Sequence, residues 1–234
     1  MLALTTAQIA QLSADQLNSL SLSAIVQLGT NDIQALTSRQ VQSLSTANLS
    51  NLTTRQIQSL KTDQVAALAS ANVVALRTDQ IQALTTAQVA GLNSAQLGAM
   101  STGQVAALST AQVKDLSAKT IANLTSTQLN ALGTSQVNTL SKDQVSGLTT
   151  GQVAGLSTAS LKVLTTGGIA ALTNDQVKAL TTSQVANWSS RQLQALQTGQ
   201  LQAMTTQQVA ALPTASVRAL GTAQVQALTT AQVA

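Results

Sequence analysis

The chain has almost no aromatic side chains and few charged ones. It contains one tryptophan, no phenylalanine or tyrosine, no histidine and no cysteine, and its seven acidic residues are all aspartates. Histidine and cysteine are the side chains that most readily serve as a base or a soft nucleophile near neutral pH, and the aspartates are scattered singly. We therefore expect no enzymatic activity, and we name no catalytic, cofactor-binding or metal-binding residue.

Long apolar runs are also missing. No apolar run approaches the roughly 18 residues of a membrane span, and the N-terminus lacks the charged and apolar blocks of a secretory signal. The absence of cysteine excludes disulfides and leaves the redox compartment open. The net charge is +4, yet the basic residues follow no recurring register and have no aromatic residues between them. We expect no membrane span and no nucleic-acid partner.

What the chain does contain is one octapeptide, here called the octad, of which Leu84–Gly91 (LTTAQVAG) is a clean copy. From Leu4 onward it recurs 29 times without insertion or deletion, the last copy being one residue short. Position six is Val, Ile or Leu in every copy, position five is Gln in 21 copies, and every junction keeps Ser or Thr at position two or three. Position one is Leu in 26 copies, with three exceptions: Met100, Trp188 and Met204.

The octad carries the signals of a helix start. A Ser or Thr N-cap accepts a hydrogen bond from a backbone N–H three residues later, and a Gln at that third position reaches back to the cap, which is a capping box. Leu at position one and Val at position six then form a hydrophobic staple. Examples of the predicted core are Leu84, Val89, Leu108, Val113, Leu148, Val153 and Trp188. Examples of the predicted junction caps are Thr85, Thr86, Gln88, Thr149, Thr150 and Gln152.

One continuous helix does not fit this period. At about 100° per residue the apolar pair would drift by about 80° in each octad and wind around the rod. The helix must therefore break in each octad, and we place the break at the Ser/Thr pair. Where only position three carries a hydroxyl, as at Thr214 after Pro213, we expect the cap to shift by one residue. These features predict an all-α solenoid of very short capped helices, one per octad.

The alternative is a β-solenoid in which three octads form each coil and Thr, Val and Gln stack in ladders. Successive side chains of a strand point to opposite faces, and positions one and six are five residues apart. A straight strand would therefore bury one of these two apolar positions and expose the other, unless the chain turned a corner between them. Asp at position four and Lys or Arg at position seven would lie near the N- and C-terminal ends of short helices, where their charges suit the helix dipole. Both observations favour helices.

We find no linker, so residues 1–234 are predicted to form a single uninterrupted array. Solenoids end in atypical capping repeats, but the last residues here, Thr229–Ala234 (TTAQVA), are pure consensus. We therefore expect the sequence to be an excerpt of a longer array.

Two resemblances bear on function. The phrase Leu-Thr-Thr-x-Gln-Val is similar to the opening of the first helix in the DNA-binding repeats of TAL effectors, but the long period, second helix and base-reading pair of that family are missing, so no function carries over. The whole chain resembles the Thr/Gln/Val/Ala/Leu repeat tracts of large secreted or surface adhesin-like exoproteins of Gram-negative bacteria. That resemblance implies an extracellular or cell-surface, non-enzymatic segment.

The function expected from these observations is structural: a stalk, a spacer or a filament-forming element. Low charge and consensus octads at the chain end suggest self-association into a fibre as one partner interaction. The alternative is a binding module whose repetitive Thr/Gln face contacts ice, a glycan or another surface. Positions four, seven and eight vary widely, which favours the structural role because a binding face would keep an outward position constant.

The helical and strand alternatives predict different far-UV circular dichroism spectra. We expect the paired minima of α-helix and a cooperative thermal melt. A single strand-type minimum would contradict the helical solenoid and would place Thr and Gln in stacked ladders.

Overall fold

The computed structural model describes residues 5–233, and every regular element in this range is a short α-helix. One helix of four to six residues forms in each octad. The predicted all-α solenoid is confirmed. The β-solenoid alternative is wrong, since no strand occurs within residues 5–233.

The chain divides into two compact units, Met1–Leu116 and Ser117–Ala234, each of which is described by itself. The single-array organisation therefore stays a prediction from the sequence. The helices of the first unit are α1 (Thr6–Ala10), α2 (Ala14–Asn18), α3 (Leu22–Gln27), α4 (Thr30–Ala35), α5 (Ser38–Ser43), α6 (Thr46–Asn51), α7 (Thr54–Ser59), α8 (Thr62–Ala66), α9 (Ser70–Ala75), α10 (Thr78–Ala83), α11 (Thr86–Ala90), α12 (Ser94–Ala99), α13 (Thr102–Ala107) and α14 (Thr110–Asp115).

The second unit has the same construction. Its helices are α15 (Ala118–Ile121), α16 (Ser126–Ala131), α17 (Thr134–Asn138), α18 (Lys142–Ser146), α19 (Thr150–Gly155), α20 (Thr158–Val163), α21 (Thr166–Ala171), α22 (Asn174–Ala179), α23 (Thr182–Val185), α24 (Ser190–Gln194), α25 (Thr198–Ala203), α26 (Thr206–Ala210), α27 (Thr214–Val217), α28 (Thr222–Ala227) and α29 (Thr230–Val233).

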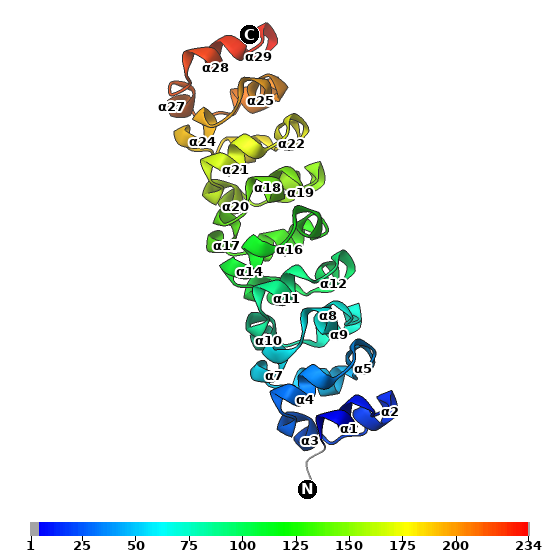
Figure 1. Ribbon diagram of the computed structural model, residues 1–234. Helices are drawn as coiled ribbons and strands as arrows, with labels where there is room; N and C mark the ends of the chain where they lie inside the picture. The colour runs from blue at the N-terminus through cyan, green and yellow to red at the C-terminus, as the bar shows by residue number, and fades with distance from the viewer. Residues whose placement is uncertain (1–4, 234) are drawn as a thin grey trace. The chain divides into compact units, whose positions relative to one another are not determined.

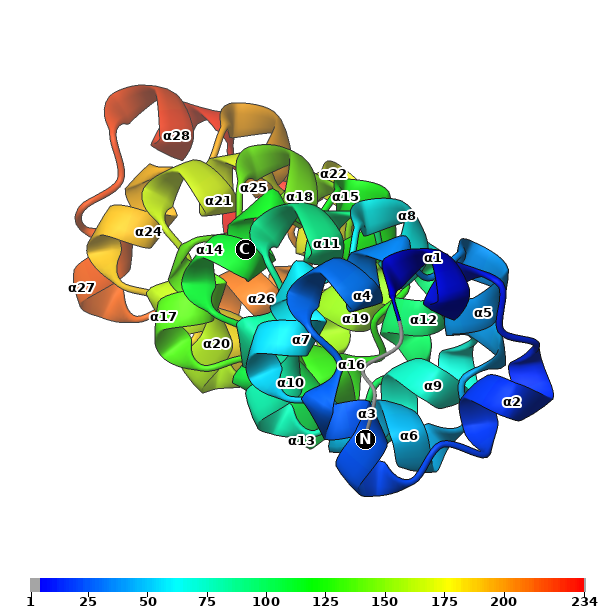
Figure 2. The same ribbon diagram turned by 60° about the horizontal axis from the view of Figure 1, so that its bottom comes forward.

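Within each unit a helix packs on the helix three octads before it and on the one three octads after it. In the first unit this gives three columns of helices, one of which runs α1, α4, α7, α10 and α13. Figure 1 shows the helices of each unit rising in successive layers, and Figure 2 shows α7, α10 and α13 one behind another. We call one revolution of the chain a coil; it takes between three and four octads.

The helix breaks at positions one and two of the octad. Leu84 ends α10 with φ −58° and ψ 138°, and Thr85 follows with φ −69° and ψ 158°, so both residues are extended. Thr86 is already the first residue of α11. The expected break at the Ser/Thr pair is therefore wrong by one residue. The reason is geometric, because an N-cap hydroxyl accepts from the backbone N–H three residues later only when the cap itself is extended.

Positions one, five and six are buried, as Leu84, Gln88 and Val89 illustrate. Positions two, four and seven are exposed in most octads, and positions three and eight are intermediate or exposed. Leucine and valine therefore form one continuous apolar core inside each unit, and the glutamine side chain lies beside them. Stacking of adjacent coils buries this surface, as expected for a quasi-one-dimensional repeat protein.

Position eight lies close to position three of the octad three before it. A Cβ added at Gly155 would lie 2.5 Å from Ser126 Oγ, and one added at Gly91 would lie 2.8 Å from Thr62 Cγ2. Real Cβ atoms do not approach neighbours this closely, so the two coils would have to move apart. The space at position eight is therefore limited, in keeping with the predominance of the small residues Ala, Gly and Ser there, and at Gly91 and Gly155 it leaves no room for a Cβ without a shift of the neighbour.

Two glycines of α19 separate packing from helix propensity. At Gly151 a Cβ would have only Thr149 Oγ1 nearby, at 4.0 Å. We expect Gly151→Ala to raise the free energy of unfolding by up to about 1 kcal/mol, the propensity difference between Ala and Gly. Gly155→Ala should gain nothing or lose stability because its new methyl meets Ser126. Equal gains from both substitutions in chemical denaturation would contradict close coil packing.

Candidate functional site at the contact between coils

The group that recurs most regularly at the contact between coils is the position-five glutamine. Gln104 accepts a hydrogen bond at Oε1 from the backbone N–H of Ser101, at 2.9 Å, which closes the capping box of α13. Its Nε2 donates to the carbonyls of Val73 and Leu76 in the preceding coil, at 2.8 and 2.7 Å. One buried amide therefore caps its own helix and bonds the carbonyl end of another.

The same arrangement repeats through both units. In each case Nε2 donates to carbonyls 28 and 31 residues earlier. The glutamines with these bonds are Gln40, Gln56, Gln64, Gln80, Gln88, Gln96, Gln104, Gln112, Gln152, Gln176, Gln184, Gln192, Gln200, Gln208, Gln224 and Gln232. Because the carbonyls near a helix C-terminus have no partner inside the helix, the amide supplies a donor that the short helices lack.

The glutamine bonds the N–H of the N-cap even where the N-cap residue at position two has no hydroxyl. At the start of α8 the N-cap is Lys61, which makes no side-chain cap hydrogen bond. Gln64 Oε1 nevertheless accepts from the Lys61 N–H at 2.6 Å, and its Nε2 donates to Ile33 and Leu36. The N-cap stays at position two even when only position three carries a hydroxyl. The expected one-residue shift of the cap is therefore wrong, also at Pro213, which is the N-cap of α27.

Two octads that lack the glutamine use an amide from the preceding coil. In the octad of Asn48 the Ser45 N–H donates to Asn18 Oδ1, at 2.8 Å, and Asn18 Nδ2 donates to the Ser43 carbonyl. In the octad of Ser160 the Ser157 N–H donates to Asn130 Oδ1, at 2.7 Å. A position-seven asparagine from the coil below thus replaces the missing half of the capping box.

The sequence contains the same spacing, from a position-seven asparagine to an octad without Gln, at a third place. Position seven is Asn at three places only, and each lies 30 residues before a position five that is not Gln. The pairs are Asn18 with Asn48, Asn130 with Ser160, and Asn138 with Gly168. A further octad that lacks Gln, that of Ser216, has Pro213 at position two and so has no N–H to satisfy. Sequence reasoning missed this spacing because the coil length was unknown.

The predicted junction residues do not share one role. Thr85 and Thr149 are N-caps and accept from the N–H groups of Gln88 and Gln152. Thr86 and Thr150, predicted to share the capping, are instead the first helical residues of α11 and α19. The predicted core residues Leu84, Val89, Leu108, Val113, Leu148, Val153 and Trp188 are all buried.

Trp188 differs from the leucines whose position it takes. It is 2% exposed, and its Nε1–H has no hydrogen-bond partner. A buried donor without an acceptor costs about 1–3 kcal/mol. The ring therefore fills the apolar core but loses a hydrogen bond, and nothing near it indicates a ligand.

Charged groups form no reactive cluster in the part of the chain that the structure describes. The ion pair Arg77–Asp79 joins Nη2 and Oδ2 at 3.0 Å, and the Arg77 guanidinium also donates to the Ser50 carbonyl one coil earlier. Hydrogen bonds from Arg77 hold the pKa of Asp79 below its usual range. Among residues 5–233 no three His, Cys, Asp or Glu side chains come together as a metal site would require.

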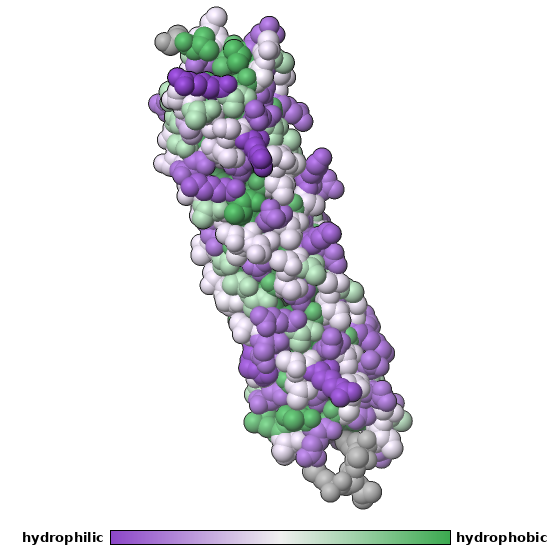
Figure 3. Space-filling model, turned by 90° about the vertical axis from the view of Figure 1, so that its left-hand side faces the viewer, coloured by the Kyte–Doolittle hydropathy of each residue, from purple (hydrophilic) through white to green (hydrophobic). Residues whose placement is uncertain are grey.

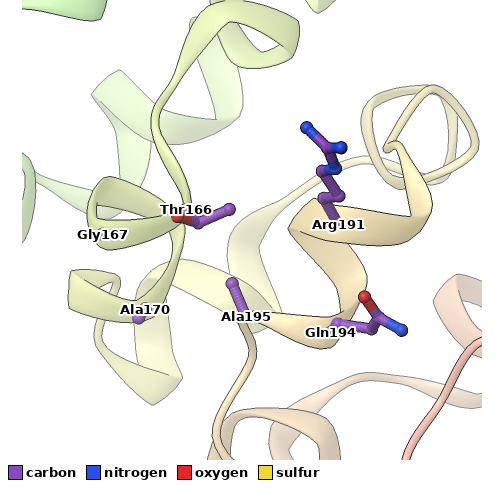
Figure 4. A pocket seen from close by; sticks show the side chains of 6 residues that line it. All are labelled: Thr166, Gly167, Ala170, Arg191, Gln194 and Ala195. Carbon is purple, nitrogen blue, oxygen red and sulfur yellow. The ribbon is translucent and has the colours of Figure 1, made fainter.

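A shallow groove of about 480 Å³ lies between α21 and α24. Figure 4 shows its lining, with the Gln194 side chain pointing away from α21. The groove holds one guanidinium, from Arg191, and its lining residues include no carboxylate, histidine or cysteine. The lining residues are Thr166, Gly167, Ala170, Arg191, Gln194 and Ala195.

Comparison with known proteins identifies the repeat. A family model described as the ALTTAQ repeat matches ten overlapping stretches: residues 25–62, 43–78, 59–94, 73–110, 86–118, 105–142, 121–158, 145–182, 175–206 and 202–234. No curated protein matches the chain. Within residues 5–233, none of the helices has the length and apolar character needed to cross a membrane.

A buried and an exposed glutamine of α25 test the bridging amide. Gln200→Glu replaces the donor to Ile169 and Leu172 with a carboxylate facing carbonyl oxygens. We expect a loss of about 3 kcal/mol in the free energy of unfolding near neutral pH. The loss should shrink as the pH falls through the raised pKa of the introduced carboxyl and should be smallest near a pH of about 4, because burial raises that pKa and protonation restores a donor. The control is Gln202→Glu at an exposed position, and equal losses would contradict the bridge.

A double-mutant cycle tests the asparagine replacement. Asn130→Ala removes the acceptor of the Ser157 N–H and the donor to the Gly155 carbonyl, and should cost about 1 kcal/mol. Ser160→Gln in the same chain should recover that loss, since the new amide closes the capping box from within its own octad. Additive effects of the two substitutions on the denaturation midpoint would show that the two positions are independent.

Proposed function

Because this chain belongs to the ALTTAQ repeat family, we propose that it is a non-enzymatic structural segment, serving as a stalk or spacer in a secreted or surface protein of a bacterium. The observation that carries the proposal is the use of the recurring polar groups. Position-five glutamines are buried and bonded to backbone groups of their own octad and of the preceding coil. The groups that the sequence repeats therefore serve to hold coils together.

The outward positions support the same role. Position four carries Ala, Asp, Arg, Lys, Gly, Thr, Ser, Asn or Gln, and position seven carries Ala, Gln, Lys, Asn, Ser or Val among others. A surface that recognised a repetitive ligand would keep one of these rows uniform. In an array that only has to span a distance, the residues at positions four and seven can vary, provided that the surface stays polar.

The extracellular assignment rests on composition. The chain lacks cysteine and has few charges, in keeping with the adhesin-like exoprotein tracts of Gram-negative bacteria that it resembles. A spacer outside the cell would also benefit from a fold that grows by adding octads, because each octad contacts only neighbouring coils.

The alternative role as an ice- or glycan-binding module receives less support. A Thr/Gln face would need exposed glutamines, but those at position five lie inside the coil contact. The hydroxyl at position two, such as that of Thr149, is engaged as an N-cap. Such binding would rest on position-three hydroxyls alone.

A spacer predicts that length follows octad number. Deletion of residues 52–83, which are four whole octads, should shorten the maximum dimension measured by small-angle X-ray scattering, and a duplication of the same residues should lengthen it by the same amount. Helical content per residue should not change. The control deletion, residues 56–83, removes 28 residues and breaks the octad phase, so it should lower stability. An unchanged maximum dimension in both octad variants would refute the spacer role.

A further inference from the structure

Asparagines at positions seven and eight of the octad differ in their hydrogen bonds. The position-seven residues Asn18 and Asn130 bond backbone groups of the following coil. Position eight is asparagine in three octads, at Asn51, Asn123 and Asn187. Within residues 5–233, Asn51 and Asn187 donate from Nδ2 only to the carbonyl four residues earlier, at 2.7 and 2.8 Å. The contact between coils therefore does not account for these two side chains.

Each position-eight asparagine begins a triplet of the form Asn-x-Ser/Thr. The three triplets are Asn51-Leu52-Thr53, Asn123-Leu124-Thr125 and Asn187-Trp188-Ser189. In every one the middle residue is the position-one core residue, and the hydroxyl residue is the N-cap of the next helix. Asn-x-Ser/Thr, with any middle residue except proline, is the acceptor motif of N-linked glycosylation. The octad thus places this motif across a junction between two helices.

The junction turns the two ends of the triplet outward and its middle inward. Asn123 and Thr125 are exposed, whereas Leu124 is 2% exposed. The exposed asparagine and the buried middle residue recur in the other two triplets. The cause is the extended backbone of the junction, as at Leu52 with φ −57° and ψ 139°, because successive side chains of an extended segment point to opposite sides. Figure 3 shows hydrophilic side chains protruding along the face in view.

A fourth triplet separates the sequence pattern from its exposure. Asn48-Leu49-Ser50 has the same motif but lies inside α6. Asn48 is 4% exposed and Leu49 is fully buried. The Asn48 Nδ2 lies 3.4 Å from the carbonyl oxygens of Leu17 and Asn18 in the preceding coil, so a sugar on this nitrogen would have to enter the contact between coils. Of the four motifs in the sequence, the fold exposes three.

The exposed amides can carry a substituent without loss of their hydrogen bond. An asparagine Nδ2 has two hydrogens, and in Asn123 one of them donates to the Lys119 carbonyl at 2.6 Å. Replacement of the other hydrogen leaves this bond in place. The cap hydroxyl of Thr125 keeps its bonds to Gln128 as well, because it is not itself modified.

We propose that Asn51, Asn123 and Asn187 are N-glycosylation sites of the folded array. The donor is a sugar activated as a phosphate ester, and a separate glycosyltransferase catalyses the transfer. Nδ2 forms a bond to the anomeric carbon, and the bond from that carbon to the phosphate oxygen breaks. The phosphate leaves with the electron pair, and one amide proton passes to a base of the transferase, so no oxidant or reductant is needed. This inference rests on the proposed place of the chain in a secreted or surface protein, where attached glycans would keep the surface polar.

The chain isolated from the cells that produce it provides the first test. Its peptides are fragmented by electron transfer, which leaves the bond between sugar and asparagine intact, and are analysed by mass spectrometry. Sugar masses are expected on the three exposed acceptors and on neither Asn48 nor Asn130, which is exposed but lies outside the motif. An unmodified chain, or sugar on serine and threonine alone, overturns the proposal. Equal modification of Asn48 also overturns it, because the folded array would then not be the acceptor.

Two substitutions at one residue separate the motif from the fold. Thr125→Asp destroys the motif but keeps a good N-cap, and Thr125→Ser keeps both. Made in the same cells, Thr125→Asp should lose the sugar on Asn123 and Thr125→Ser should retain it, with Asn51 and Asn187 as internal references. Circular dichroism melts check that both variants are folded. Retention of the sugar in Thr125→Asp contradicts the proposal. The spacer role stands or falls separately, on the lengths of the octad variants described above.

Discussion

The structure depends on one amide that recurs in most octads. A helix of four to six residues leaves most of its backbone groups without partners, since four N–H groups at its start and four carbonyls at its end lie outside its own hydrogen-bond pattern. The glutamine at position five accepts from the N–H of the N-cap and donates to carbonyls of the preceding coil, as Gln104 does. The same side chain therefore stabilises the short helix and fixes the distance between coils.

This constraint explains which octads can vary. A cap without a hydroxyl is tolerated at Lys61 because Gln64 remains. A missing glutamine is tolerated at Ser160 because Asn130 supplies the acceptor from below, and at Ser216 because the residue at position two is a proline without an N–H. The apolar core varies only in the size of its side chains: positions one and six are apolar in every octad, and Trp188 is accommodated with an unpaired Nε1–H. Apolar packing and backbone hydrogen bonding together set the pattern of the octad.

The same interaction supports the proposed function. Because the coil contact uses groups that most octads carry, an array can be lengthened without a new kind of interface. Outward residues are then free to vary, which suits a stalk or spacer. The contact between coils is directional, because the position-five amide of one coil donates to carbonyls of the preceding coil.

The sequence by itself determined the helices, their number and their caps. The eight-residue period rules out a continuous helix, and Thr, Gln, Leu and Val at fixed positions specify a capping box and a staple; these are local relations within about five residues. The break at positions one and two is also local, because the Thr85 hydroxyl accepts from the N–H of Gln88 three residues later. The tertiary structure decided the rest: that a coil takes between three and four octads, and that the glutamine bonds the coil below. These features join residues about 28 apart, and identical octads contain nothing that tells one such distance from another until the coils are stacked.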